Sequence, residues 1–175
     1  MRAGILLDIP CDDRPAAGPP TGRALLGVGT KRMTRIAQLF SRLKTEDQRG
    51  LIAYVTAGDP SIERTPALVE ALEAGGADLV ELGVPFSDPV ADGPVIQRAS
   101  ERALRAGATL EKVLECARVI RRRSRIPLIL FSYLNPLLRY GFERFAATAA
   151  EAGVDGVLLT DLSVEEAGPL VRLSR

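Results

Sequence analysis

Apolar residues follow two patterns along this chain, one with the period of a helix and one with the short continuous runs of buried strands. A first helix is predicted after Thr34, which can cap it, because apolar residues follow at helical spacing: Ile36, Leu39, Phe40 and Leu43. Capping residues, glycines and prolines predict further helices at residues 61–75, 94–107, from 109 onward, and 142–152. Ser163 and Glu166 form a Ser-x-x-Glu capping box, which predicts a last helix reaching Arg175.

Short apolar runs predict four strands between these helices, at residues 51–56, 78–83, 126–132 and 155–160. Apolar strands that alternate with helices indicate a parallel sheet covered by helices, as in a (β/α)₈ barrel or a doubly wound sheet. Residues 73–80 and 151–158 also resemble each other, each with Ala-Gly at a helix end and an aspartate, Asp78 or Asp155, at a strand start. Aligning the two aspartates sets Glu81 opposite Leu158, an ordinary core residue.

Residues 1–32 follow neither pattern. Prolines and glycines are mixed there, and the apolar run at residues 5–7 is too short for a signal peptide or a membrane span. We therefore expect a disordered extension over residues 1–32 and one domain, a partial barrel, over residues 33–175. Met33 followed by Thr34 looks like a natural start, so an upstream translation artefact is one explanation of the extension.

Composition narrows the possible chemistry. With 175 residues and a net charge of +1, the chain suits one globular domain and gives no sign of a nucleic-acid or membrane partner. It has no histidine, which excludes Ser-His and Cys-His nucleophiles and histidine metal sites. Its two cysteines, Cys11 and Cys116, lack metal or redox spacing, which is typical of a reduced cytoplasmic protein. Four arginines at a predicted helix end favour a solvated face over a phosphate site: Arg121, Arg122, Arg123 and Arg125.

The strongest chemical signal lies in residues 78–94. Glu81 interrupts an apolar strand, where a buried charge costs several kcal/mol unless it is paired or neutralised. Because side chains alternate along a strand, Glu81 can face a barrel interior that opens at the carboxyl ends of the strands, where barrel active sites lie. Asp88 and Asp92 follow on the loop that leaves this end. Structural roles remain open, since Glu81 could pair with an arginine and Asp92 could cap the next helix.

The run from Glu81 to Pro94, Glu-Leu-Gly-Val-Pro-Phe-Ser-Asp-Pro-Val-Ala-Asp-Gly-Pro, resembles the signature of the tryptophan synthase alpha chain family. Residues after the other strands agree with it: Thr56-Ala57-Gly58-Asp59-Pro60, Tyr133-Leu134-Asn135-Pro136 and Asp161. The resemblance runs from about Met33 to Arg175. It implies a TIM (β/α)₈ barrel, of which this chain would hold an N-terminal helix and about the first four βα units.

The resemblance implies a lyase of tryptophan biosynthesis. Such an enzyme cleaves indole-3-glycerol phosphate, by a retro-aldol step, to indole and glyceraldehyde 3-phosphate. Glu81 matches the family's general acid/base, and Asp92 matches the acid that hydrogen-bonds the indole N–H. Four residues match the apolar indole pocket, although Tyr133 suits plain core packing equally well: Tyr54, Phe131, Tyr133 and Leu158.

The resemblance also implies a partner. The family's alpha chain joins a beta chain in an alpha2beta2 heterotetramer, and Asp88 and Pro89 match the interface loop. No metal or organic cofactor is implied for this chain, because the pyridoxal phosphate belongs to the beta chain. Ser163 stands where the family commonly has proline, near the beta chain, and this departure bears on partner packing only.

The predicted elements cover only part of a barrel. A (β/α)₈ barrel typically has ~250 residues and holds phosphate in the loops after strands 7 and 8, which have no counterpart here. We therefore expect an N-terminal fragment, from a truncated gene or an incomplete assembly, that is inactive alone. One alternative is a non-catalytic module that docks on a beta chain through Pro85–Asp92. Another is a different phosphate-sugar barrel enzyme, against which the Glu81–Pro94 match argues.

Overall fold

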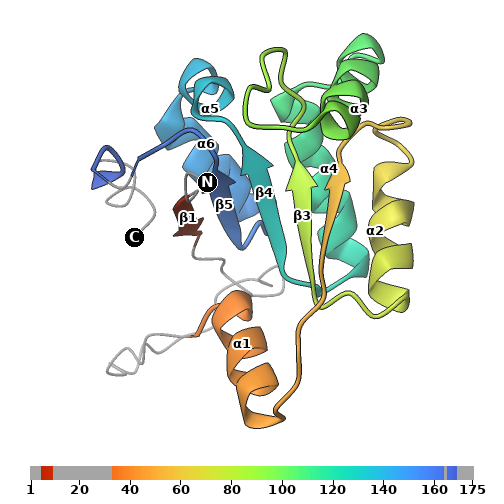
Figure 1. Ribbon diagram of the computed structural model, residues 1–175, viewed down its shortest axis with the longest axis vertical. Coiled ribbons are helices and arrows are strands. Elements are labelled where there is room, and N and C mark those ends of the chain that lie inside the picture. Colours follow the sequence, from red (N-terminus) through yellow and green to blue (C-terminus); the bar gives the residue numbers. More distant parts are fainter. Residues whose placement is uncertain (1–4, 10–32, 164, 169–175) are drawn as a thin grey trace, which may run out of the picture.

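The computed structural model describes residues 5–9, 33–163 and 165–168, which form one sheet with helices around it (Figure 1). The sheet has the order β1-β5-β4-β3-β2. Four strands are parallel and adjacent: β2 (Ile52–Thr56), β3 (Leu79–Gly83), β4 (Leu128–Ser132) and β5 (Gly156–Leu159). The short strand β1 (Ile5–Asp8) pairs antiparallel with β5.

Helices α2 (Thr65–Ala74), α4 (Leu110–Arg123) and α6 (Phe142–Glu151) connect the parallel strands. Two further helices, α3 (Pro94–Arg105) and α5 (Leu134–Tyr140), follow the carboxyl ends of β3 and β4. Helix α1 (Arg35–Thr45) lies below the opposite strand ends (Figure 1). β2, β3 and β4 are thus each followed along the chain by helix and then by the next strand, as the apolar pattern predicted.

The two faces of the sheet pack against different partners. Val80 and Leu82 of β3 belong to the large core, together with buried residues of α4 such as Val113 and Ile120. The opposite face, which carries Leu79, packs against α1 in a smaller cluster: Ile36, Leu39, Leu43, Leu79 and Ile129. This confirms the predicted alternation, with one apolar set under the helices and the other on the interior face.

In the predicted repeat at residues 73–80 and 151–158, the two aspartates attach helix α1 to the sheet in the same way. Asp78 accepts hydrogen bonds from the Leu51 amide (2.9 Å) and from Arg42 of α1 (2.9 Å). Asp155 does the same with the Leu128 amide (2.8 Å) and with Arg35 of α1 (2.7 Å). Each aspartate therefore joins the start of the preceding strand to α1. The repeated glycines, Gly76 (φ 96°) and Gly153 (φ 76°), adopt the left-handed conformation that glycine favours.

Asp155 has a third partner that the sequence did not predict. Arg121, expected on a solvated face, instead lies partly buried and donates to the Asp155 carboxylate (2.9 Å). It also donates to the carbonyls of Ser124, Ile126 and Gly153. The solvated-face prediction is wrong for Arg121, because these carbonyls and the buried aspartate satisfy all sides of its guanidinium.

The extension predicted for residues 1–32 needs a correction at residues 5–9. Residues 5–8 form β1, and Leu7 of this strand and Ile9 directly after it are 4% and 5% exposed. The apolar run was too short to stand alone, but a strand edge supplies the backbone partners that it lacks. Residues 1–4 and 10–32 lie outside the described part of the chain.

Several local predictions also differ from the structure. Phe40 was placed on the buried stripe of α1 but is 49% exposed, because Ile36, Leu39 and Leu43 suffice to cover Leu79. Helix α2 begins at Thr65 rather than at Ser61. Helix α5 was not predicted; Pro136 lies in its first turn, where proline is tolerated. Ser163 donates to the Glu166 carboxylate (2.9 Å), and most of the last predicted helix lies outside the described residues.

Candidate active site

Glu81 lies at the middle of β3, on the interior face of the sheet. The parallel register pairs it with Tyr54 of β2 and with Ile129 of β4. Its side chain is half-buried among these neighbours, and this burial raises the pKa of the Glu81 carboxyl above its ordinary value. A carboxyl whose pKa is raised keeps its proton to higher pH, which suits a group that both gives and takes a proton.

Tyr54 and Phe131 form an aromatic wall beside Glu81. Their rings meet edge to face, with centroids 5.4 Å apart and an interplanar angle of 83°. Tyr54 reaches Phe131 across Gly83, where a Cβ atom would come within 2.1 Å of the Tyr54 hydroxyl oxygen. Glycine at the end of β3 therefore makes room for the tyrosine ring. Thr56 donates a long hydrogen bond (3.4 Å) to the same hydroxyl.

We expect Gly83→Ala to displace the Tyr54 ring and to cost about 1–3 kcal/mol of unfolding free energy, the usual range for overpacking. Burial is the main cause that raises the pKa of Tyr54, so a displaced and more exposed ring should titrate closer to its ordinary value. Absorbance titration of the three tyrosines would measure this shift. A Cβ added at Gly93 meets nothing within 4 Å, so Gly93→Ala is the matched control. An unchanged titration in Gly83→Ala would contradict the proposed contact.

Asp92 lies on the loop between β3 and α3, and Tyr133 fixes that loop. The amide of Ala91 donates to the Tyr133 hydroxyl (2.8 Å), and Tyr133 is 3% exposed. Burial raises the pKa of Asp92, while a hydrogen bond from Tyr133 lowers it. Phe86 of the same loop packs against the Tyr133 ring, with centroids 5.2 Å apart. Tyr133 therefore serves both as buried core and as a direct partner of the candidate acid.

The charges of the two carboxylates both act on the Tyr54 hydroxyl. Burial raises the pKa of Tyr54, a hydrogen bond from Thr56 lowers it, and the negative charges of Asp92 and Glu81 raise it further. A carboxylate has this effect only when it lies close to the group that titrates. Glu81 from the strand and Asp92 from the loop thus lie near enough to Tyr54 for their charges to act on its hydroxyl.

We expect Tyr133→Phe to loosen the loop and to raise the pKa of Asp92 further, because it removes the hydrogen bond that lowers this pKa. Loss of the acceptor for the Ala91 amide should cost about 0.5–1.5 kcal/mol of unfolding free energy. An NMR titration of the Asp92 carboxyl and a urea titration would measure both effects. Tyr140→Phe is the control, since it keeps the ring on which Arg144 stacks at 4.2 Å. Equal effects of the two variants would contradict this role of Tyr133.

The remaining predicted site residues lie on the interior face of the sheet and on the loop after β3. Leu158 of β5 pairs in register with Phe131 and is partly buried on the interior face, so four predicted pocket and acid positions share that face: Tyr54, Glu81, Phe131 and Leu158. Asp88 is exposed and Pro89 is partly buried on the loop before Asp92, away from the sheet interior. Sequence reasoning missed the roles of Gly83 and Phe86, of which only Gly83 carried a signal, as a glycine inside a strand pattern.

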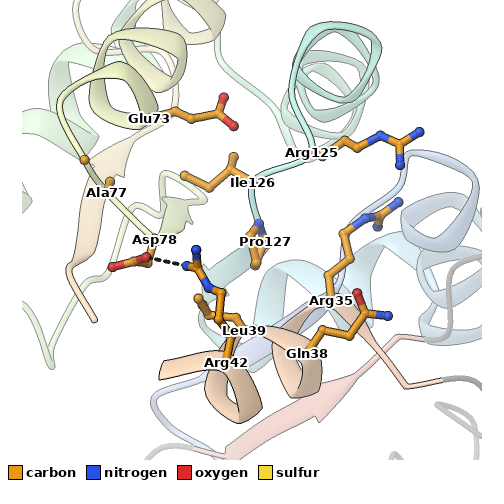
Figure 2. A pocket seen from close by; sticks show the side chains of 11 residues that line it. Arg35, Gln38, Leu39, Arg42, Glu73, Ala77, Asp78, Arg125, Ile126 and Pro127 are labelled. Carbon is orange, nitrogen blue, oxygen red and sulfur yellow. Dashed lines mark hydrogen bonds and ion pairs between the residues drawn. The ribbon is translucent and has the colours of Figure 1, made fainter. Parts of the chain in front are cut away.

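A cavity of about 530 Å³ lies at the other end of the strands (Figure 2). Residues of α1 and of the segments before β3 and β4 line it, among them Arg42, Asp78 and Arg125. Arg42 and Asp78 form an ion pair across it (2.9 Å), so these two charges offset each other. The cavity therefore lies beside the contacts that hold α1 to the amino-terminal ends of the strands, at the end opposite Asp92.

Among residues 5–9, 33–163 and 165–168, no group of three or more His, Cys, Asp or Glu side chains could hold a metal ion. None of the helices within these ranges is both long enough and apolar enough to cross a membrane. Cys116 is buried in the main core, as predicted, and burial raises the pKa of its thiol to about 12.

Parallel strands joined by helices, with Glu81 within β3 and Asp92 on the loop after its carboxyl end, define this chain as part of a (β/α)₈ barrel. A family model described as "Tryptophan synthase alpha chain" matches residues 40–175. The chain therefore belongs to the tryptophan synthase alpha chain family, as the Glu81–Pro94 signature predicted.

Individual proteins of this family are also similar to this chain in sequence and in structure. The chain is 68% identical over 135 residues to the tryptophan synthase alpha chain of Solibacter usitatus, covering 77% of this chain and 51% of that protein. The crystal structure of tryptophan synthase subunit alpha from Legionella pneumophila matches with a TM-score of 0.80 and 46% identity, over 82% of this chain and 55% of that one. A structure of tryptophan synthase from M. tuberculosis matches with a TM-score of 0.77 and 36% identity, over 81% and 57%. The chain thus spans about half the length of the curated relatives it matches.

Proposed function

We propose that this chain supplies the acid–base half of a lyase site that cleaves indole-3-glycerol phosphate to indole and glyceraldehyde 3-phosphate. The position of Glu81 level with Tyr54 on the interior face of the sheet, with Asp92 on the loop that Tyr133 holds, carries this proposal. Family membership supports the same reaction. The protein would act in tryptophan biosynthesis, in the cytoplasm.

Each of the two acids suits one requirement of this reaction: proton transfer and the stabilisation of a positive charge. Carbon–carbon cleavage needs a proton at indole C3, and Glu81, whose pKa is raised by burial, is suited to deliver it. Glu81 can then accept the proton of the glycerol hydroxyl as the bond breaks. Protonation at C3 leaves positive charge near the ring nitrogen, where a fixed Asp92 carboxylate stabilises it most in the transition state. Tyr54, Phe131 and Leu158 offer the apolar surface for the indole ring.

A chimera provides the test. Residues 40–175 of this chain would replace the matching half of the Solibacter usitatus alpha chain, to which they are 68% identical over 135 residues. We expect this chimera to release indole from indole-3-glycerol phosphate, measured by indole absorbance. A folded chimera that releases no indole would overturn the proposal. The 175-residue chain alone should show no release, because barrels typically hold phosphate in the loops after strands 7 and 8.

A second function, docking on a beta chain without catalysis, is favoured by the exposed loop after β3. Asp88 is exposed there, and Val90 is 76% exposed beside it. Such a loop offers apolar contact and charge to a partner, and an alpha2beta2 assembly is the form we propose. Co-purification of the 175-residue chain with a tryptophan synthase beta chain would support it, and loss of binding in Val90→Asp would locate the contact. Equal binding of Val90→Asp and the unchanged chain would exclude this loop.

A further inference from the structure

Strand β1 occupies a place in the sheet that a barrel gives to another strand. It pairs with the outer edge of β5 from Ile5↔Leu159 to Asp8↔Gly156, and the Ile9 amide extends the pairing to the Asp155 carbonyl (3.0 Å). In a (β/α)₈ barrel all strands are parallel, so the neighbour of β5 on this edge would run parallel to it. β1 runs antiparallel, and it lies outside the residues 40–175 that match the family.

The contact between β1 and β5 is closely fitted. Leu7 and Ile9 join the main core next to Val157 and Leu159. Gly156 lets the strands approach, since a Cβ atom there would lie 3.0 Å from the Leu7 carbonyl oxygen and 3.2 Å from Leu6 Cδ1. Alternate apolar residues thus point into the core, while Leu6, 43% exposed, lies on the interior face.

We propose that the outer edge of β5 is a docking site for an extended strand with apolar residues at alternate positions, and that β1 is its displaceable occupant. An unpaired strand edge presents a row of N–H and C=O groups, which an added strand satisfies. β1 therefore covers this edge. While it is paired there, a parallel strand that would continue the sheet into a closed barrel cannot pair with β5. This inference does not depend on the lyase activity.

Hydrogen exchange on the full 175-residue chain tests the proposal. Leu7→Asp puts a charge into the core position of β1, and exchange of the β5 amides, Gly156–Leu159, should become about tenfold faster or more. Leu6→Asp is the matched control, because its side chain is already half exposed on the other face, and it should leave exchange unchanged. A synthetic peptide of residues 1–10, added to the Leu7→Asp chain, should slow the exchange of β5 again.

Three results would overturn the proposal. Unchanged exchange in Leu7→Asp would mean that β1 does not protect the edge. Faster exchange in β2 and β3 as well would mean that β1 is a fixed part of the fold rather than a displaceable strand. Failure of the peptide to restore protection, or equal restoration by a peptide carrying Leu7→Asp, would mean that the edge does not select an apolar strand.

Discussion

Replacing Glu81 with glutamine should lower kcat for indole release by about 10²–10⁴-fold in the Solibacter usitatus chimera, the usual contribution of general acid–base catalysis. Glutamine keeps the size of the side chain but cannot deliver a proton to indole C3. Because the interaction is used in the transition state, KM should change much less than kcat. Steady-state rates of indole release would measure both. Normal turnover in Glu81→Gln would show that Glu81 is not the acid/base.

The same substitution should not weaken the fold. Burial raises the pKa of Glu81 in the folded protein, so the folded state holds this proton more tightly than the unfolded chain does. Stability therefore falls as pH rises from the ordinary glutamate pKa toward the raised value, and the ionised carboxylate is a cost at neutral pH. Glu81→Gln removes that cost, so its urea midpoint at neutral pH should equal or exceed that of the unchanged chain. Activity loss with a raised midpoint separates chemistry from unfolding.

The apolar pattern was sufficient to predict the parallel sheet and the face on which Glu81 lies. Strand periodicity separates Leu79 and Glu81 from Val80 and Leu82, and the structure packs the two sets against different layers. The signature from Glu81 to Pro94 was sufficient to predict the family. Both the strand periodicity and the signature lie within short stretches of sequence, so they can be recognised without knowing which distant residues are in contact.

Contacts between distant residues could not be predicted in the same way. The site wall depends on Tyr54 passing over Gly83 to reach Phe131, which only the strand register determines. β1 forms because a distant strand edge accepts it, whereas its own sequence is a short apolar run among prolines and glycines. Arg121 looked like one of four equivalent surface arginines until Asp155, 34 positions away, was brought beside it.

Replacing Asp155 with alanine should destabilise the protein by about 3–5 kcal/mol, the range for breaking a buried ion pair from one side. The Asp155 side chain is 2% exposed, and its partners Arg35 and Arg121 are 17% and 15% exposed. Alanine leaves two largely buried guanidinium groups without this carboxylate and removes the acceptor of the Leu128 amide. Since domains are stable by about 5–15 kcal/mol, the loss should appear as a large drop in the urea midpoint.

The internal repeat supplies the matched control, because Asp78→Ala removes an equivalent aspartate from a more open place. Its partner Arg42 is 54% exposed, so water can replace the lost carboxylate, and the cost should be about 1 kcal/mol. Asp155→Asn tests the charge alone, since it keeps the size and an acceptor for Leu128. If Asp155→Ala and Asp78→Ala cost the same, burial is not what gives the pair its strength. A larger loss at Asp155 means that the buried cluster of Asp155, Arg35 and Arg121 contributes more to stability than the exposed pair of Asp78 and Arg42 does.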